Sequence, residues 1–210
     1  MGDDFDFWDL QRTAWSLSRQ AQWQKPLPPL LLFTDPVRTP DPLAAAAALP
    51  PGAAVVFRAF GAADRLQVGQ ALRRLTRDRG VRLLIGADAA LARTCRADGV
   101  HLPERLAHRA QALLRAQPGW LVTAAAHSLT AARAGLAGGA QAVVISAVFR
   151  SKSPSSGAPL GPLRLAALTR AAGGPVYALG GIHMKNARRL LASGVVGLAA
   201  VEGLVPSTKP

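Results

Sequence analysis

Cysteine and acidic side chains are scarce in this chain of 210 residues. The one cysteine, Cys95, excludes an internal disulfide and a metal cluster held by cysteine ligands. The most apolar windows, residues 27–33 and 44–57, are short and interrupted by prolines, so we expect no membrane-spanning helix. Residues 1–6 include three aspartates where a secretory signal would have a basic segment. We therefore expect a cytoplasmic protein with no membrane partner.

Twelve acidic residues stand against 25 basic ones, and arginine outnumbers lysine 21 to 4, which gives a net charge of +13. Such a balance can indicate a nucleic-acid partner. The arginines, however, are spread over nearly every predicted helix, and no aromatic residues interleave with them to stack bases. Nucleic-acid binding is therefore the less favoured interpretation, and a small phosphorylated molecule fits the positive charge equally well.

Eight short apolar segments alternate with segments of helical periodicity. The apolar segments are continuous, as in strands that are covered on both faces of a parallel sheet. They span residues 30–33, 53–57, 81–85, 99–102, 120–124, 142–146, 176–179 and 197–201. Helices are predicted over residues 66–79, 89–96, 106–116, 128–137, 162–172 and 186–194. This pattern predicts an α/β protein with a (β/α)₈ TIM barrel, and a doubly wound open sheet is the alternative.

The two ends of the chain depart from a regular barrel. Apolar residues near helical spacing, among them Leu10, Trp15 and Leu17, predict an amphipathic helix within residues 1–25. After the eighth strand only residues 202–210 remain, too few for a full eighth helix. We expect residues 26–210 to form a single barrel domain, and the N-terminal helix to cover the surface that an eighth helix would otherwise hide.

Glycines at the last two strands suggest a phosphate site. Gly180 and Gly181 follow the seventh strand, and Gly197 belongs to the eighth. Backbone N–H groups of glycines can approach a phosphate closely, and barrels of this type bind phosphate after their last two strands. The alternative is that Gly180 and Gly181 only make a tight turn.

Arg58 and His127 are the leading side-chain candidates, because each lies just after a predicted strand. Arg58 suits an anionic ligand, and a structural ion pair with a carboxylate such as Asp35 is an equal alternative. His127 suits acid/base chemistry near neutral pH, and a histidine bonded to backbone is the alternative. His101, inside a strand, is predicted to be a hydrogen-bonded core histidine.

The loop over residues 147–161 concentrates hydroxyl groups and cations in Ser151, Lys152 and Ser153. A long polar and basic loop is typical of a mobile substrate lid. A plain flexible loop is the alternative.

Taken together and in this order, these segments resemble the thiamine phosphate synthase superfamily, including its TenI branch of thiazole tautomerases. The resemblance runs from about residue 30 to residue 204. It rests on the segments at residues 33–35, 97–102, 127–129, 147–149 and 178–182, together with Arg58.

Synthases of this family join a pyrimidine diphosphate to a thiazole phosphate and need magnesium. Where they carry Gln-x-Arg-x-Lys, this chain has Val56, Arg58 and Phe60. Their two metal-binding aspartates correspond to Ala87 and Leu106. Magnesium is held by carboxylates together with substrate phosphates, so the resemblance predicts no metal site and no cofactor here unless the chain is a synthase with substitute ligands, such as Asp35 or Asp88.

The TenI branch needs no metal. The resemblance implies that His127 is the acid/base group, that Arg58 holds the substrate carboxylate, and that Gly180, Gly181 and Gly197 hold the phosphate. Ser151, Lys152 and Ser153 correspond to the family's hydroxyl- and lysine-bearing loop. We therefore expect a thiazole tautomerase-like enzyme of thiamine biosynthesis that binds a small phosphorylated heterocycle, with a second copy of the chain as a candidate partner in a homo-oligomer. A synthase and a catalytically inactive ligand-binding barrel remain as alternatives.

Overall fold

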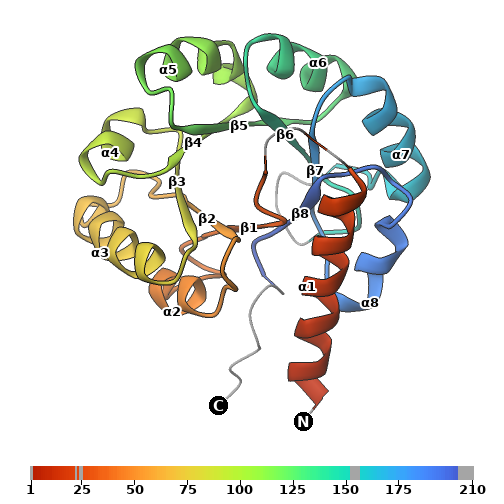
Figure 1. The fold of residues 1–210 in the computed structure, drawn as a ribbon, viewed down its shortest axis with the longest axis horizontal. Helices are drawn as coiled ribbons and strands as arrows, with labels where there is room; N and C mark the ends of the chain where they lie inside the picture. The colour runs from red at the N-terminus through yellow and green to blue at the C-terminus, as the bar shows by residue number, and fades with distance from the viewer. Residues whose placement is uncertain (1, 22, 24–25, 152–156, 203–210) are drawn as a thin grey trace.

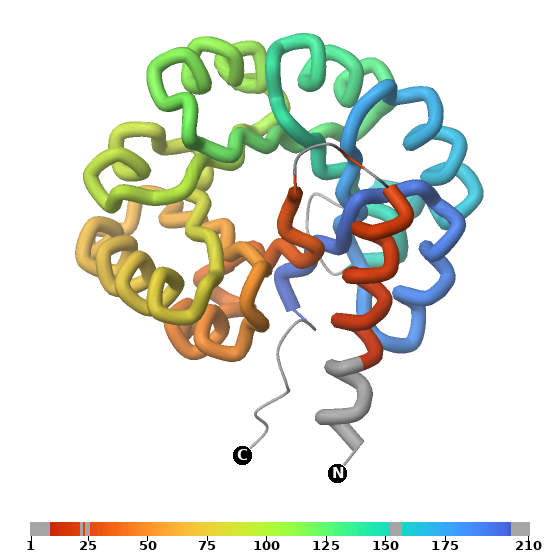
Figure 2. The backbone as a smooth tube through the Cα atoms, in the orientation of Figure 1, coloured from red at the N-terminus to blue at the C-terminus, as the bar shows by residue number. Residues whose placement is uncertain are grey.

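The computed structural model describes residues 2–21, 23, 26–151 and 157–202, with only the backbone for residues 2–8. Eight parallel strands form a closed barrel in chain order, with helices around the outside (Figures 1 and 2). The pairing of β1 with β8, in which Leu31 lies opposite Ala199, closes the ring. The predicted TIM barrel is confirmed, and the open-sheet alternative is wrong.

The strands coincide with the predicted apolar segments to within two residues at either end. They are β1 (Leu30–Phe33), β2 (Ala54–Phe57), β3 (Arg82–Gly86), β4 (Gly99–Leu102), β5 (Leu121–Ala126), β6 (Ala142–Ile145), β7 (Val176–Leu179) and β8 (Gly197–Ala200). Alternate residues face the barrel interior and the surrounding helices. In β1, Leu31 and Phe33 belong to the interior core, whereas Leu30 and Leu32 pack toward the helices. Both sets are buried, which explains the continuous apolar runs.

The helices between the strands are α2 (Pro42–Ala47), α3 (Arg65–Asp78), α4 (Ala89–Thr94), α5 (Ala110–Ala116), α6 (Leu129–Ala137), α7 (Gly161–Ala172) and α8 (Met184–Ala187). The 3₁₀ turns η1 (Glu104–Arg109) and η2 (Arg188–Leu190) precede α5 and follow α8. Two expectations were wrong. Helix α2, which begins with a proline after the capping side chain of Asp41, was not predicted. The helix predicted over residues 186–194 is replaced by α8 and η2.

The N-terminal helix α1 (Gly2–Gln20) lies against α8 and β8, where a regular barrel would have its eighth helix (Figure 1). Leu10, Ala14 and Leu17 form its buried stripe and belong to the core between strands and helices. Trp15 is partly buried against the same core, whereas Trp23, beyond the helix end, is 45% exposed. A helix is therefore present within residues 1–25, and its described side chains pack on the barrel surface formed by α8 and β8.

We expect deletion of residues 1–25 to lower the melting temperature sharply, because it exposes the apolar surface of α8 and β8. A single substitution in α1 tests the same covering role with less disruption. Leu17→Ala should reduce the free energy of unfolding by about 2–4 kcal/mol, since it leaves a cavity at a buried site, whereas Arg19→Ala, on the exposed side of α1, serves as the control. Urea unfolding followed by circular dichroism measures both variants. An unchanged midpoint after the deletion would contradict this role for α1.

His101 on β4 lies in the barrel interior, directly below the open end of the strands. Its Nδ1 is 2.9 Å from Oγ1 of Thr123 on β5, and its ring meets that of Phe33 edge-on, with centroids 4.8 Å apart. Burial, assisted by the positive charge of Arg58, lowers the pKa of His101 to about 3. His101 is therefore a neutral, hydrogen-bonded core histidine, as predicted.

The depressed pKa of His101 makes stability depend on pH. Below about pH 6.5 the unfolded chain binds a proton at His101 that the folded chain does not bind. The free energy of unfolding should therefore fall as the pH is lowered from about 6.5 to about 4, by up to about 1.4 kcal/mol per pH unit. Urea titrations at several pH values give the free energy of unfolding as a function of pH. This free energy should change less steeply with pH in His101→Gln than in the wild type. In His108→Gln, whose side chain is exposed, it should change as in the wild type. Equal slopes in all three proteins would rule out this contribution.

Candidate functional site

A cavity of about 1450 Å³ opens at the carboxyl ends of the strands and is lined by the loops that follow them. Its charge is strongly unbalanced. Among the described residues, Asp88 and Glu202 are the carboxylates in its lining, against seven arginines: Arg38, Arg58, Arg65, Arg93, Arg105, Arg109 and Arg150. A positive field of this kind attracts ligands that carry several negative charges. The cavity therefore suits a phosphorylated molecule.

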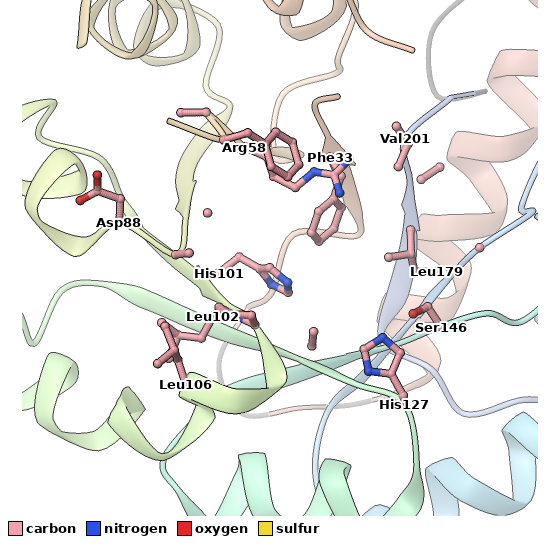
Figure 3. Close-up of a pocket in the computed structure, with 18 of the residues that line it drawn as sticks. Phe33, Arg58, Asp88, His101, Leu102, Leu106, His127, Ser146, Leu179 and Val201 are labelled. Atoms are coloured by element: carbon pink, nitrogen blue, oxygen red, sulfur yellow. The ribbon is translucent and has the colours of Figure 1, made fainter. Parts of the chain in front are cut away.

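Arg58 follows β2 and is fixed by the neighbouring strand end. Its backbone N–H donates to Oγ1 of Thr34 at 2.9 Å, and its Nε donates to the Thr34 carbonyl at 2.7 Å. The guanidinium carbon also lies over the rings of Phe33 and Phe60, at 5.8 and 5.2 Å from their centroids. These contacts hold the guanidinium at the cavity wall (Figure 3).

The ion pair between Arg58 and Asp35 is present, with Nη2 3.2 Å from Oδ2. The same carboxylate oxygen is 3.1 Å from Nη2 of Arg38, so two cations share one anion. Hydrogen bonds from Arg38 and Val37 hold the pKa of Asp35 down to about 2. Nη1 of Arg58 has no hydrogen-bond partner among the described residues. Arg58 therefore belongs to a structural ion pair and still offers a donor to an anion.

His127 lies at the opposite edge of the cavity from Arg58, just before α6 (Figure 3). Its Nδ1 is 2.8 Å from Oε2 of Glu104, and its backbone N–H donates to the same oxygen at 2.9 Å. Its Nε2 has no hydrogen-bond partner among the residues that the structure describes. The predicted alternative was a histidine ring that is hydrogen-bonded to backbone groups. The partner of the ring is instead the side-chain carboxylate of Glu104.

Gly180 and Gly181 both line the cavity and both have positive φ angles, 101° and 63°. The loop after β6 packs directly on them: a Cβ on Gly181 would lie 2.2 Å from the carbonyl oxygen of Arg150, and one on Gly180 would lie 2.9 Å from Ala147. Close backbone approach therefore explains both glycines. Among the described residues, no backbone hydrogen bond outside the helices and strands has the N–H of Gly180 or Gly181 as its donor. With only four residues, α8 adds little dipole to this site.

The expectation for Gly197 was wrong. Gly197 is the first residue of β8, and its pairing with Tyr177 puts it at the amino end of the barrel, away from the cavity. A Cβ there would lie 2.5 Å from the Pro29 carbonyl oxygen and 2.8 Å from the Tyr177 ring. Gly197 thus allows close packing at the amino end of the barrel, and it is not among the residues that line the cavity.

The predicted lid is only partly described. Ser151 lines the cavity, whereas Lys152 and Ser153 lie outside the described residues. Glu202 also lines the cavity, where its side chain is exposed.

The magnesium that a synthase would need does not fit the described residues. Among them, no group of three or more His, Cys, Asp or Glu side chains could hold a metal ion. Asp88 caps α4, with Oδ1 accepting from the Leu91 N–H at 2.8 Å, and Figure 3 shows its carboxylate at the periphery, turned away from His101 and His127. Leu106, which the resemblance sets at the position of the second metal-binding aspartate, lines the cavity, and Asp35 is taken up by two arginines. Among the described residues, neither position that the resemblance assigns to a metal-binding aspartate, Ala87 or Leu106, carries a carboxylate.

Glu104 was missed in the sequence analysis. It follows β4 by two residues, at the same end of the barrel as the candidates that were chosen. The rule that ligands meet the carboxyl ends of strands, applied to the few acidic residues of this chain, would have included it. Its contact with His127, 23 residues later, depends on the parallel pairing of β4 with β5.

In the described part of the chain, no helix is both long and apolar enough to cross a membrane.

Comparison with known proteins gives consistent matches. The model of the family described as "Thiamine monophosphate synthase" matches residues 31–204. A putative thiamine-phosphate synthase of Geobacter sulfurreducens is 36% identical over 146 residues, which cover 69% of this chain and 68% of that protein. A thiamine-phosphate synthase of Chromobacterium violaceum is 37% identical over 164 residues, which cover 76% of this chain and 79% of the relative.

Among solved structures, a thiamine phosphate pyrophosphorylase from Pyrococcus furiosus superposes with a TM-score of 0.69 at 26% identity. The superposition covers 81% of this chain and 83% of that protein. The family model covers nearly the whole barrel, from β1 to β8. The chain therefore belongs to the thiamine monophosphate synthase/TenI family.

Proposed function

We propose that this protein is an enzyme of thiamine biosynthesis that moves a proton on a phosphorylated thiazole carboxylate without a metal ion, as in the TenI branch of its family. The observation that carries this proposal is the position of His127. Its ring lies at the edge of a cationic cavity, and only one ring nitrogen has a hydrogen-bond partner in the described chain. The other nitrogen, Nε2, can accept a proton from a bound substrate and return it at a second position.

Binding of the substrate follows from the charges around the cavity. Nη1 of Arg58 binds the carboxylate, and the proton transfer then takes place beside a fixed positive charge. The N–H groups of Gly180 and Gly181 bind the phosphate. The arginine and the glycine N–H groups bind the two anionic groups of the substrate from different sides of the barrel. The heterocycle is thereby held between Arg58 and His127. Ser151, with Lys152 and Ser153 of the same loop, would cover the phosphate.

The second candidate is a thiamine-phosphate synthase, and the names of the relatives favour it. That reaction releases pyrophosphate and depends on magnesium to balance the charge that develops on it. Ala87 and Leu106, at the positions that the resemblance assigns to the metal-binding aspartates, count against it, and Asp88 would have to serve as a substitute ligand. A barrel that binds the ligand without turnover is the third candidate.

Proton transfer is tested with the thiazole carboxylate phosphate in deuterated buffer that contains EDTA, followed by proton NMR. The wild type should isomerise the substrate, and His127→Gln should lower the rate by about 100-fold or more, since it removes the acid/base group. His108→Gln, at an exposed position on η1, is the matched control and should keep the wild-type rate. Magnesium-dependent joining to the pyrimidine diphosphate, without isomerisation, would instead identify a synthase.

The role of Arg58 is tested with two ligands, the thiazole carboxylate phosphate and the same phosphate without its carboxylate. By isothermal titration calorimetry, the wild type should bind the carboxylate form about 10-fold more tightly or better, because a charge-assisted hydrogen bond is formed. Arg58→Gln should bind both ligands alike. If Arg58→Gln still binds the carboxylate form more tightly, Arg58 does not bind the substrate carboxylate and serves only in its structural ion pair.

A further inference from the structure

We propose that Glu104 is a positioning residue that holds the His127 ring in one tautomer, with hydrogen on Nδ1 and the lone pair of Nε2 free toward the cavity. This inference deepens the proposed function and rests on the role given there to His127. It concerns a residue that touches the histidine and not the substrate.

The hydrogen bonds assign the tautomer. Oε2 of Glu104 lies 2.8 Å from Nδ1 and 2.9 Å from the backbone nitrogen of His127. An ionised carboxylate only accepts hydrogen bonds, so the short contact requires a hydrogen on Nδ1. In a neutral imidazole, Nε2 is then the nitrogen with the lone pair. Because free imidazole side chains exist in both tautomers, this contact selects the form that can accept a proton from a ligand.

One carboxylate oxygen fixes both the ring and the start of the helix that follows. The backbone N–H of His127 and its ring nitrogen converge on Oε2, which restricts the rotation of the side chain about its first bonds. The next residue, Ser128, caps α6 by accepting from the Ala131 N–H at 3.1 Å. Glu104 therefore holds the ring, and the cap at Ser128 fixes the start of the helix that directly follows His127.

Glu104 is itself held by the packing of its segment. It is the first residue of η1, directly after Pro103, and η1 packs against both β5 and α6. Ala107 of η1 is buried in the core, and the Gln111 N–H donates to the Gly138 carbonyl at the far end of α6 at 2.9 Å. Glu104 and His127 thus belong to elements with a fixed relative position.

The contact contributes little to the stability of the fold, because the side chains of His127 and Glu104 are 56% and 43% exposed and water screens such pairs. The main effect of the contact is therefore on the orientation of the ring and not on the free energy of unfolding. A positioning role and a structural role thus predict different results. Glu104→Ala should leave the urea midpoint close to that of the wild type while changing the state of the His127 ring.

The test is nitrogen NMR on protein labelled with ¹⁵N-histidine, at a pH where the rings are neutral, since protonated and unprotonated ring nitrogens have well-separated shifts. The His127 signals are assigned by their loss in His127→Gln. In the wild type they should report hydrogen on Nδ1. Glu104→Ala should shift the population toward hydrogen on Nε2. Glu104→Gln, whose amide oxygen still accepts, should keep the wild-type tautomer, as should the control Asp78→Ala at the exposed end of α3.

Kinetics provide the second readout. Glu104→Ala should lower kcat for isomerisation by about 10-fold or more, with KM within about 2-fold of the wild type, because the substrate still finds its binding groups. Glu104→Gln should recover most of this loss.

A wild-type His127 with hydrogen on Nε2, or a tautomer unaffected by Glu104→Ala, would overturn the positioning role even if His127→Gln abolishes isomerisation. If the tautomer changes as expected in a protein that shows no isomerisation, the positioning role of Glu104 holds and the proposed function fails.

Discussion

The shortage of carboxylates at a cavity rich in arginine is the constraint on which the proposed chemistry of this barrel depends. Three acidic side chains near the mouth already have partners. Asp35 is shared by Arg38 and Arg58, Asp88 caps α4, and Glu104 accepts from His127. A divalent cation would have to compete with these contacts in a strongly positive field, whereas an anionic ligand meets no such barrier. The same contacts fix the arginine and the histidine that a metal-independent proton transfer requires.

The barrel provides the rigidity for this arrangement through backbone packing. Atoms of the loop after β6, most of them backbone atoms, pack directly against Gly180 and Gly181. The positive φ angles and the missing Cβ atoms of these glycines allow that approach. At the opposite end, Gly197 allows β8 to approach the ring of Tyr177, whose hydroxyl donates to the Pro28 carbonyl at 2.8 Å. The helix α1 then covers β8 and α8 on the outside. The strand ends that present Arg58 and His127 thus belong to a completely closed ring.

The sequence was sufficient to predict the barrel, because strands buried on both faces leave continuous apolar runs that recur with each repeat. It was also sufficient to identify Arg58, His127 and Gly180 as residues at strand ends, since strand direction determines which end carries the site. Gly197 was misassigned because it begins its strand, and composition alone does not distinguish a glycine needed for packing from one needed for a ligand. The contact of Glu104 with His127 joins two neighbouring repeats, and the pairing of β4 with β5, which the residue pattern alone does not give, brings them together. Lys152 and Ser153 remain predictions.

The central claim is that ligand binding at this cavity relies on protein cations and backbone N–H groups, and not on magnesium. Isothermal titration calorimetry with the thiazole carboxylate phosphate, once in EDTA and once in excess magnesium chloride, measures this directly. The account predicts the same dissociation constant in both buffers, within about 2-fold. Binding that is tighter in magnesium by about 10-fold or more would contradict it, because a metal ion would then form part of the site.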